Sequence, residues 1–220
     1  LYKIFSKNLK LEKLANIYEI FEKPLIKILA FMEIEGIKID NKSLKVLSEK
    51  FGKKIKKLEK EVFKISKKEF NIASPKQLGE VIYNELKIAG IKKTRKGSFA
   101  TSANVLEDLA FKGHKFPQLI LDWRQVSKLK NTYSDSLPEH INPNTKRVHT
   151  SFLLAATTTG RLASSDPNLQ NIPIKSEDGK EIRKAFIAES DFTLISADYN
   201  QIEMRILADL ADVKELKKAF

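Results

Sequence analysis

The stretch TLISADYNQIEMRILADL, from Thr193 to Leu210, changes its pattern at a single acidic residue. The apolar run before that residue is typical of a buried β-strand, and apolar residues with helical spacing follow it. The acidic residue, Asp198, has two interpretations. It is either the N-cap of the helix, completed as a capping box by Gln201, or a metal ligand where the strand ends. The local pattern alone favours the cap.

The helix that follows Asp198 has a clear apolar stripe. Ile202, Ile206, Leu210 and Val213 share one face, which we expect to be buried. Glu203 lies beside the stripe in the first turn, where a carboxylate suits the positive end of the helix dipole.

Upstream, TTTGRLASSDPNLQNIP (Thr157 to Pro173) is rich in guanidinium and amide side chains, namely Arg161, Asn168, Gln170 and Asn171. Such donors suit the DNA minor groove, where purine N3 and pyrimidine O2 acceptors look nearly alike for every base pair. The alternative is a polar loop whose amides bond to its own turns. Composition alone favours the alternative.

The rest of the chain predicts helices first and strands later. One long amphipathic helix is predicted, because apolar residues recur at steps of three and four and form a seam along one side. The seam consists of Leu44, Leu47, Phe51, Ile55, Leu58, Val62 and Ile65. Lysines lie largely off this seam, at Lys53, Lys54, Lys56, Lys57 and Lys60. Further helices are predicted from Ser74, over about 102–110 and from Pro117 to about Tyr133. Strands are predicted at 148–154, at 182–188 after an EDGK turn (177–180), and at 193–197. The sequence therefore predicts an α+β chain.

The formal charge of +12 is unevenly distributed. Residues 151–220 hold 9 Lys and Arg against 11 Asp and Glu, so the excess positive charge lies in residues 1–150. This suggests an arm that binds a polyanion beside a site that handles cations, although lysines that merely solvate long helices would look the same. The chain has no cysteine, its 3 histidines lack metal-ligand spacing, and no segment resembles a membrane span or a signal peptide. We expect a cytoplasmic protein, and the abundant Lys and Glu would also suit a thermophile.

Two stretches together, TGRLASSDPNLQNIP and ADYNQIEMRILADL, closely resemble the family A DNA polymerases, which are similar to bacterial DNA polymerase I. The resemblance extends back through INPNTKRVHTSF, WRQVSKLKNTYSDSLP, FNIASPKQL and MEIEGIKID, and so covers the chain from about Lys23 onward. It implies a long-helix thumb followed by the first strands and helix of an antiparallel-sheet palm. The implied parts are a joining helix from a preceding exonuclease-like domain (1–22), a helix leading into the palm (23–40), the thumb (41–112) and the N-terminal part of the palm (113–220).

The resemblance also implies residue roles in nucleotidyl transfer. Asp198 matches the family's first metal-binding aspartate, with the backbone carbonyl of Tyr199 beside it, in a site for two Mg²⁺ ions. Gln201, Ile202 and Glu203 match the nucleotide pocket, in which Glu203 excludes ribonucleotides. Implied DNA contacts are made by the minor-groove residues Arg161, Asn168, Gln170 and Asn171, by Arg124 and Lys128, and by Lys92, Lys93, Arg95 and Lys96 at the thumb tip. The partners are primer–template DNA and dNTPs.

The chain departs from the family pattern mildly at Asn200 and Met204, and more seriously after Phe220. It contains no second, HDE-like metal motif and no fingers helix for the triphosphate. We therefore expect a fragment, or one piece of a split polymerase, that is inactive until a second polypeptide or segment supplies the fingers and the remaining palm. The alternative is a non-catalytic DNA-binding module. A 3′–5′ exonuclease is excluded as the activity, because the part of the family that carries its carboxylates is absent from this chain.

Overall fold

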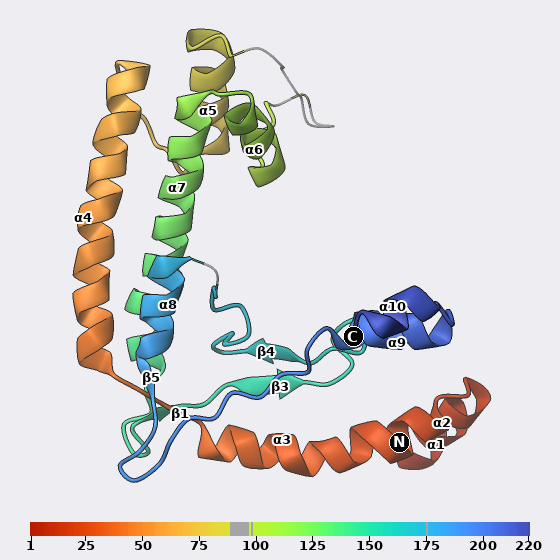
Figure 1. The fold of residues 1–220 in the computed structure, drawn as a ribbon. Helices are drawn as coiled ribbons and strands as arrows, with labels where there is room; N and C mark the ends of the chain where they lie inside the picture. The colour runs from red at the N-terminus through yellow and green to blue at the C-terminus, as the bar shows by residue number, and fades with distance from the viewer. Residues whose placement is uncertain (89–96, 98, 175) are drawn as a thin grey trace. The chain divides into compact units, whose positions relative to one another are not determined.

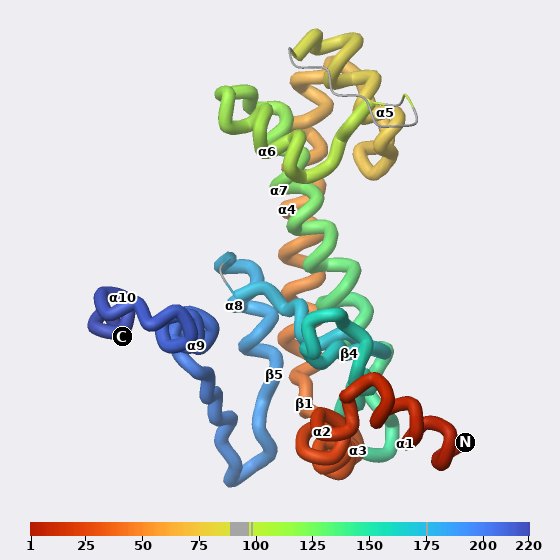
Figure 2. Tube along the Cα trace, turned by 90° about the vertical axis from the view of Figure 1, so that its right-hand side faces the viewer, coloured from red at the N-terminus to blue at the C-terminus, as the bar shows by residue number. Residues whose placement is uncertain are grey.

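The structure, a computed structural model, describes residues 1–88, 97, 99–174 and 176–220. Internal contacts divide the chain into two units, Leu1–Ile187 and Ala188–Phe220 (Figures 1 and 2). Helices predominate, and the strands are short and antiparallel, which confirms the predicted α+β class. Within the described ranges, no helix is both long and apolar enough to cross a membrane.

Most of the first unit is helical. Its α-helices are α1 (Tyr2–Leu11), α2 (Ala15–Ile17), α3 (Lys23–Glu35), α4 (Asn41–Ser66), α5 (Pro75–Glu80), α6 (Ala103–Phe111), α7 (Lys115–Leu129) and α8 (Glu177–Lys184). The π-helical turns η1 (Tyr18–Glu22), η2 (Val81–Glu85) and η3 (Lys130–Asp135) extend α2, α5 and α7, and the 3-10 turn η4 (Leu137–His140) follows. The predicted joining helix in residues 1–22 is therefore made of several helical pieces.

Two small antiparallel sheets lie among these helices. In the first, β1 (Ile37–Ile39) is the central strand between β2 (Arg147–Val148) and β5 (Phe186–Ile187). In the second, β3 (Ser151–Leu153) pairs with β4 (Ala163–Ser165). The predicted alternation in 148–154 is confirmed, since Val148 and Thr150 are buried and Ser151 is exposed, although the segment forms two short strands instead of one.

The long helix α4 begins where the Asp40 carboxylate accepts the amide hydrogen of Lys42, with 2.9 Å between the heavy atoms. Its apolar seam packs along α7, and the two helices lie side by side in both views (Figures 1 and 2). Two buried clusters result. The first is built around Val62, Leu78, Ile82, Leu106 and Ile120. The second is built around Leu44, Phe51, Leu129, Tyr133, Val148 and Ile182.

The end of α3 differs from the sequence prediction of a helix through residues 23–40. The helix stops at Glu35 because Gly36 has a φ of +62°, and β1 begins at Ile37. A Cβ atom on Gly36 would lie 2.6 Å from the carbonyl oxygen of Val148. This close approach of two backbones requires glycine and joins α3 to the first sheet.

The EDGK segment is a helix start and not the predicted turn. The Ser176 hydroxyl accepts the amide hydrogen of Gly179 at 3.1 Å, and acidic residues fill the first turn of α8. Ile182, which we predicted to begin a strand, lies inside this helix and is fully buried. Only Phe186–Ile187 of the predicted strand 182–188 pairs, as β5.

The second unit contains α9 (Ile202–Leu210) and α10 (Lys214–Lys218). The strand predicted at 193–197 is wrong, since this segment is exposed and irregular. A strand is stable only with a neighbour for its backbone groups, and the described part of this unit supplies none. The predicted buried stripe of α9 is also wrong, because Ile202, Ile206, Leu210 and Val213 are all exposed and Ala208 is the buried residue.

Candidate nucleic-acid interface and metal site

The hairpin β3–β4 and the loop after it carry the candidate minor-groove residues of the first unit. Arg161 lies just before β4, and its carbonyl accepts a hydrogen bond from the Thr157 hydroxyl at 2.8 Å. Asn168, Gln170 and Asn171 follow β4 within four consecutive residues. All four candidate side chains are exposed, so the structure brings them together on one accessible hairpin and loop.

The loop is held in place by its apolar residues, which alternate with the amides. Leu169 and Ile172 pack against the second cluster, while the neighbouring Gln170 and Asn171 remain exposed. The alternative in which the amides bond to their own turns holds for Asn168, whose Oδ1 accepts the Gln170 amide hydrogen at 3.0 Å. The apolar side chains therefore hold the loop against the second cluster, while its polar side chains point outward.

A buried hydroxyl pair fixes the backbone between the hairpin and the loop. The Thr150 hydroxyl lies 2.7 Å from the Ser164 hydroxyl and 2.8 Å from the carbonyl oxygen of Pro167, and Ser164 Oγ accepts the amide hydrogen of Leu169 at 3.1 Å. Thr150 and Ser164 are 8% and 4% exposed, so water does not compete for these groups. The sequence reasoning missed both residues; the position of Thr150 between Val148 and Phe152 in the alternating pattern was the available signal.

A second anchor comes from Tyr133 in η3. Its hydroxyl donates to the main-chain carbonyl of Asn171, and its ring is almost fully buried in the second cluster. Burial raises the pKa of the Tyr133 phenol, because the phenolate would lose its hydration. The end of α7 and the amide-bearing loop are thus joined by one hydrogen bond.

The basic candidates on α7 have different surroundings. Arg124 Nη1 donates to the Thr101 carbonyl at 2.6 Å, and burial lowers the pKa of this guanidinium. Lys128 lies one turn later and is exposed. The remaining candidates, Lys92, Lys93, Arg95 and Lys96, lie outside the described residues.

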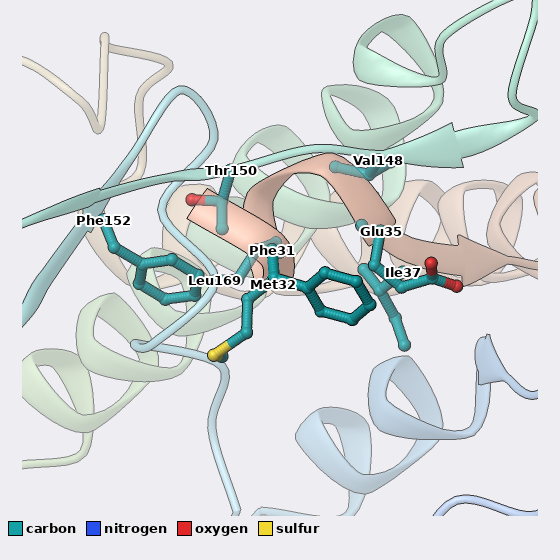
Figure 3. Close-up of a pocket in the computed structure, with 9 residues that line it drawn as sticks. Phe31, Met32, Glu35, Ile37, Val148, Thr150, Phe152 and Leu169 are labelled. Carbon is teal, nitrogen blue, oxygen red and sulfur yellow. The ribbon is translucent and has the colours of Figure 1, made fainter. Parts of the chain in front are cut away.

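Cavities lie beside the hairpin and the loop in the described part of the chain. One is an apolar pocket of about 330 Å³ between α3 and the strands, in which Phe31, Met32 and Phe152 come together with Leu169 from the loop (Figure 3). Another, of about 390 Å³, is polar and lies beside the loop; its lining includes Thr132, Ser136, His140, Asp166 and Asn168. Residues of the loop therefore line both an apolar pocket and a polar one.

The candidate metal and nucleotide residues belong to the second unit. Asp198 and Tyr199 are exposed in the irregular segment before α9. Arg205 Nε donates to the carbonyl of Asn200 at 2.9 Å and so ties this segment to the helix. The N-cap position of α9 is Gln201, with a φ of +52°, and not Asp198. The capping interpretation of Asp198 is therefore wrong, and Glu203 occupies the first turn as expected.

A two-metal site needs more donors than the candidate metal residues offer. The described residues contain no group of three or more His, Cys, Asp or Glu side chains placed to bind a metal ion. Asp198 and the neighbouring carbonyl of Tyr199 are hard oxygen donors of the kind that Mg²⁺ prefers. One carboxylate does not hold two divalent ions, so this donor set fits a share of such a site and not the whole.

Residues 41–220 match the model of a family described as DNA polymerase family A. The match agrees with the α+β fold found here and covers both the candidate loop and the candidate metal residue Asp198. The chain belongs to the family A DNA polymerases.

The chain is also similar to individual polymerases. It is 49% identical to DNA polymerase I of Rhizobium leguminosarum over 220 residues, which is 100% of this chain and 22% of the relative. It is 46% identical to the thermostable DNA polymerase I of Thermus thermophilus over 210 residues, or 95% of this chain and 25% of the relative. The chain thus spans about a quarter of the length of these curated relatives.

A solved structure shows the same fold. The polymerase domain of Pol1 from M. smegmatis, in a complex with DNA primer–template and dNTP, matches with a TM-score of 0.87 and 37% identity. The match covers 98% of this chain and 38% of that chain.

Proposed function

We propose that this chain supplies the primer-gripping part and the first metal-binding aspartate of a template-directed DNA polymerase. The observation that carries the proposal is the anchored loop, which presents Arg161, Gln170 and Asn171 outward from a buried Thr150–Ser164 pair. Together with the family match over residues 41–220, this geometry favours a surface that tests base-pair shape without reading sequence.

In this proposal, the donors of the loop contact the minor groove next to the primer terminus. Asn168 contributes its amide nitrogen, since its oxygen is engaged with Gln170. Lys128, and Lys92, Lys93, Arg95 and Lys96 at the tip, contact phosphates and fix the position of the duplex. Arg124 contributes through the guanidinium nitrogens that Thr101 does not occupy. The M. smegmatis structure, solved with primer–template and dNTP, supports these partners for this chain.

The second unit would share in binding the metals and the nucleotide. Asp198 and the Tyr199 carbonyl would hold Mg²⁺, while Gln201, Ile202 and Glu203 would line the dNTP sugar pocket. The chemistry that two bound Mg²⁺ ions would supply there is activation of the primer hydroxyl and neutralisation of the leaving pyrophosphate. The second carboxylate and the fingers must come from a polymerase segment that these 220 residues do not contain. The isolated chain should therefore bind primer–template and extend nothing.

The test is primer extension by the 220-residue chain, alone and combined with the missing polymerase segment. We expect no incorporation by the chain alone and extension by the combination. Asp198→Ala should abolish that extension while duplex affinity, measured by fluorescence anisotropy, stays within about twofold. Incorporation by the pure chain would show that the split-site proposal is wrong. Extension that survived Asp198→Ala would remove the metal role of this residue and leave a DNA-binding module as the function.

A further inference from the structure

The outer face of α4 carries a charge pattern that the polymerase site does not use. This helix holds 9 lysines and 3 glutamates between Asn41 and Ser66. Five of the lysines lie on the side opposite the buried seam of Leu44, Phe51 and Val62, and we name them the lysine stripe: Lys53, Lys56, Lys57, Lys60 and Lys64.

The stripe is continuous along the helix. Each member has another member three or four residues away, so each lysine lies next to another on the helix surface. The span of 11 residues corresponds to about 16 Å along the axis. All five side chains are exposed, whereas the seam residues on the other side of the helix are in the buried clusters. The ribbon shows α7 lying alongside α4 (Figure 1).

The five charges are not compensated within the part of the chain that the structure describes. Lys54, on the flank of the same helix, forms an ion pair with Asp178 at 2.5 Å, and Lys68 pairs with Glu85. None of the five stripe lysines has such an ion pair among the described residues, and the nearby Glu49 and Glu61 do not change the sign of the face. Five adjacent cations repel one another and make no packing contact that requires them, so the face is suited to an external polyanion.

We infer that the lysine stripe is a binding surface for the phosphodiester backbone of duplex DNA, separate from the surface that holds the primer terminus. Phosphates spaced along a strand match a row of flexible ammonium groups, which need no fixed bonding geometry. The stripe offers no aromatic ring on which a base could stack and no amide that could read a base edge. These omissions favour a duplex over a single strand.

The helical arrangement separates this surface from the other candidate contacts. On α7, Val126 packs with the apolar residues of α4 in the second cluster, and Arg124 and Lys128 lie on the opposite side of the helix. A duplex held by Arg124 and Lys128 leaves the outer face of α4 free for another length of duplex. The inference therefore goes beyond the proposed polymerase function and does not depend on Asp198.

The experiment compares two five-site variants of the 220-residue chain with the same charge. The first replaces the stripe with glutamine (K53Q, K56Q, K57Q, K60Q and K64Q). The control replaces five exposed lysines of the N-terminal helical region and the turn after α1 (K3Q, K7Q, K10Q, K13Q and K27Q). Glutamine has nearly the helix propensity of lysine, and matched circular-dichroism melting curves confirm that both variants fold. Affinity for a blunt duplex of about 20 base pairs, and for a single strand of the same length, is measured against KCl concentration.

For the duplex, we expect the slope of log K against log salt concentration to become shallower by about 3 to 4 in the stripe variant, because each lost phosphate contact changes the slope by about 0.9. The slope for the control variant should differ from that of the parent chain by no more than about one. Equal slopes in the two variants would overturn the inference, and so would an effect confined to the single strand. Primer extension with saturating primer–template in the complemented enzyme should be unchanged by the stripe variant. A failure of Asp198→Ala to abolish extension would thus contradict the polymerase proposal alone.

Discussion

Tyr133 donates its phenolic hydrogen to the main-chain carbonyl of Asn171, and this bond couples the end of the α7–η3 helix to the loop that carries the minor-groove candidates. The two residues are 38 positions apart in the sequence. The donor is buried, so a chain that loses it leaves the Asn171 carbonyl without this partner.

Tyr133→Phe should destabilise the chain by about 1 to 2 kcal/mol, because the ring still fills its place while a buried acceptor loses its donor. Urea unfolding followed by circular dichroism measures this loss. Tyr83→Phe is the matched control, since its hydroxyl donates to the Ala100 carbonyl at 2.9 Å in the other cluster. Both variants should lose similar stability, but only Tyr133→Phe should weaken primer–template binding. Equal binding by the two variants would contradict a coupling between Tyr133 and the loop.

The pH dependence of stability offers an independent test of Tyr133. Burial raises the pKa of its phenol above the unfolded value of 10.0. As the pH rises past about 10, the unfolded chain releases this proton first, so the folded chain holds more protons than the unfolded chain does. The resulting stabilisation is complete below pH 10 and is lost as the pH rises through the folded pKa. The free energy of unfolding should fall more steeply in the parent than in Tyr133→Phe as the pH rises above about 10, and parallel curves would count against this assignment.

Thr150→Val tests the buried hydroxyl pair. The substitution keeps the side-chain shape but removes the contacts to Ser164 Oγ and to the carbonyl oxygens of Ser165 and Pro167. We expect a loss of about 1 to 3 kcal/mol, because these buried groups lose a partner that water cannot replace. Thr132→Val, at an exposed position of η3, is the control and should change stability by less than about 0.5 kcal/mol. Equal losses in urea unfolding would show that the pair does not hold the loop.

The turn between α3 and β1 can be tested with two glycines. Gly36 and Gly113 both have positive φ, at +62° and +91°, so alanine is strained at either position. A Cβ at Gly36 would also lie 2.6 Å from the Val148 carbonyl oxygen, whereas nothing lies within 4 Å of one at Gly113. Gly113→Ala should cost about 1 to 2 kcal/mol, and Gly36→Ala should cost clearly more, measured by thermal unfolding. If the two variants lost similar stability, the backbone at Val148 in β2 would have moved to make room for the added Cβ.

Local patterns predicted the parts of the fold that local interactions determine. The α4 seam from Leu44 to Ile65 could be recognised in the sequence because every apolar residue is three or four positions from the next. The pairing of β1 with β2 and β5 could not, because it joins residues more than a hundred positions apart and each strand has only two or three residues. The EDGK segment was misread because its glycine looked like a turn signal. That glycine instead allows α8 to approach Pro173, whose carbonyl oxygen would lie 2.7 Å from a Cβ at Gly179.

Part of the candidate surface could be recognised in the sequence, and its functional role stays a prediction. Exposed Arg161, Gln170 and Asn171 could be picked out from side-chain chemistry, and the structure does bring them onto one hairpin and loop. The groups that hold the loop, Thr150 and Tyr133, could not be found in this way. Their role depends on which backbone carbonyl each hydroxyl reaches, and this follows only from the packing of the second cluster.

Substitutions at two neighbouring loop residues should affect DNA binding and folding stability differently. Gln170 is exposed and Leu169 packs against the second cluster. Gln170→Ala should leave the free energy of unfolding within about 0.5 kcal/mol, yet weaken binding to primer–template by a similar factor for every terminal base pair, since the minor-groove acceptors hardly differ. Leu169→Ala should instead cost about 2 kcal/mol or more, because it leaves a void beneath the loop. Urea unfolding and fluorescence anisotropy with the four terminal base pairs measure both quantities. A Gln170→Ala effect that depended on the terminal base pair would show sequence readout, which a polymerase that copies every template must avoid.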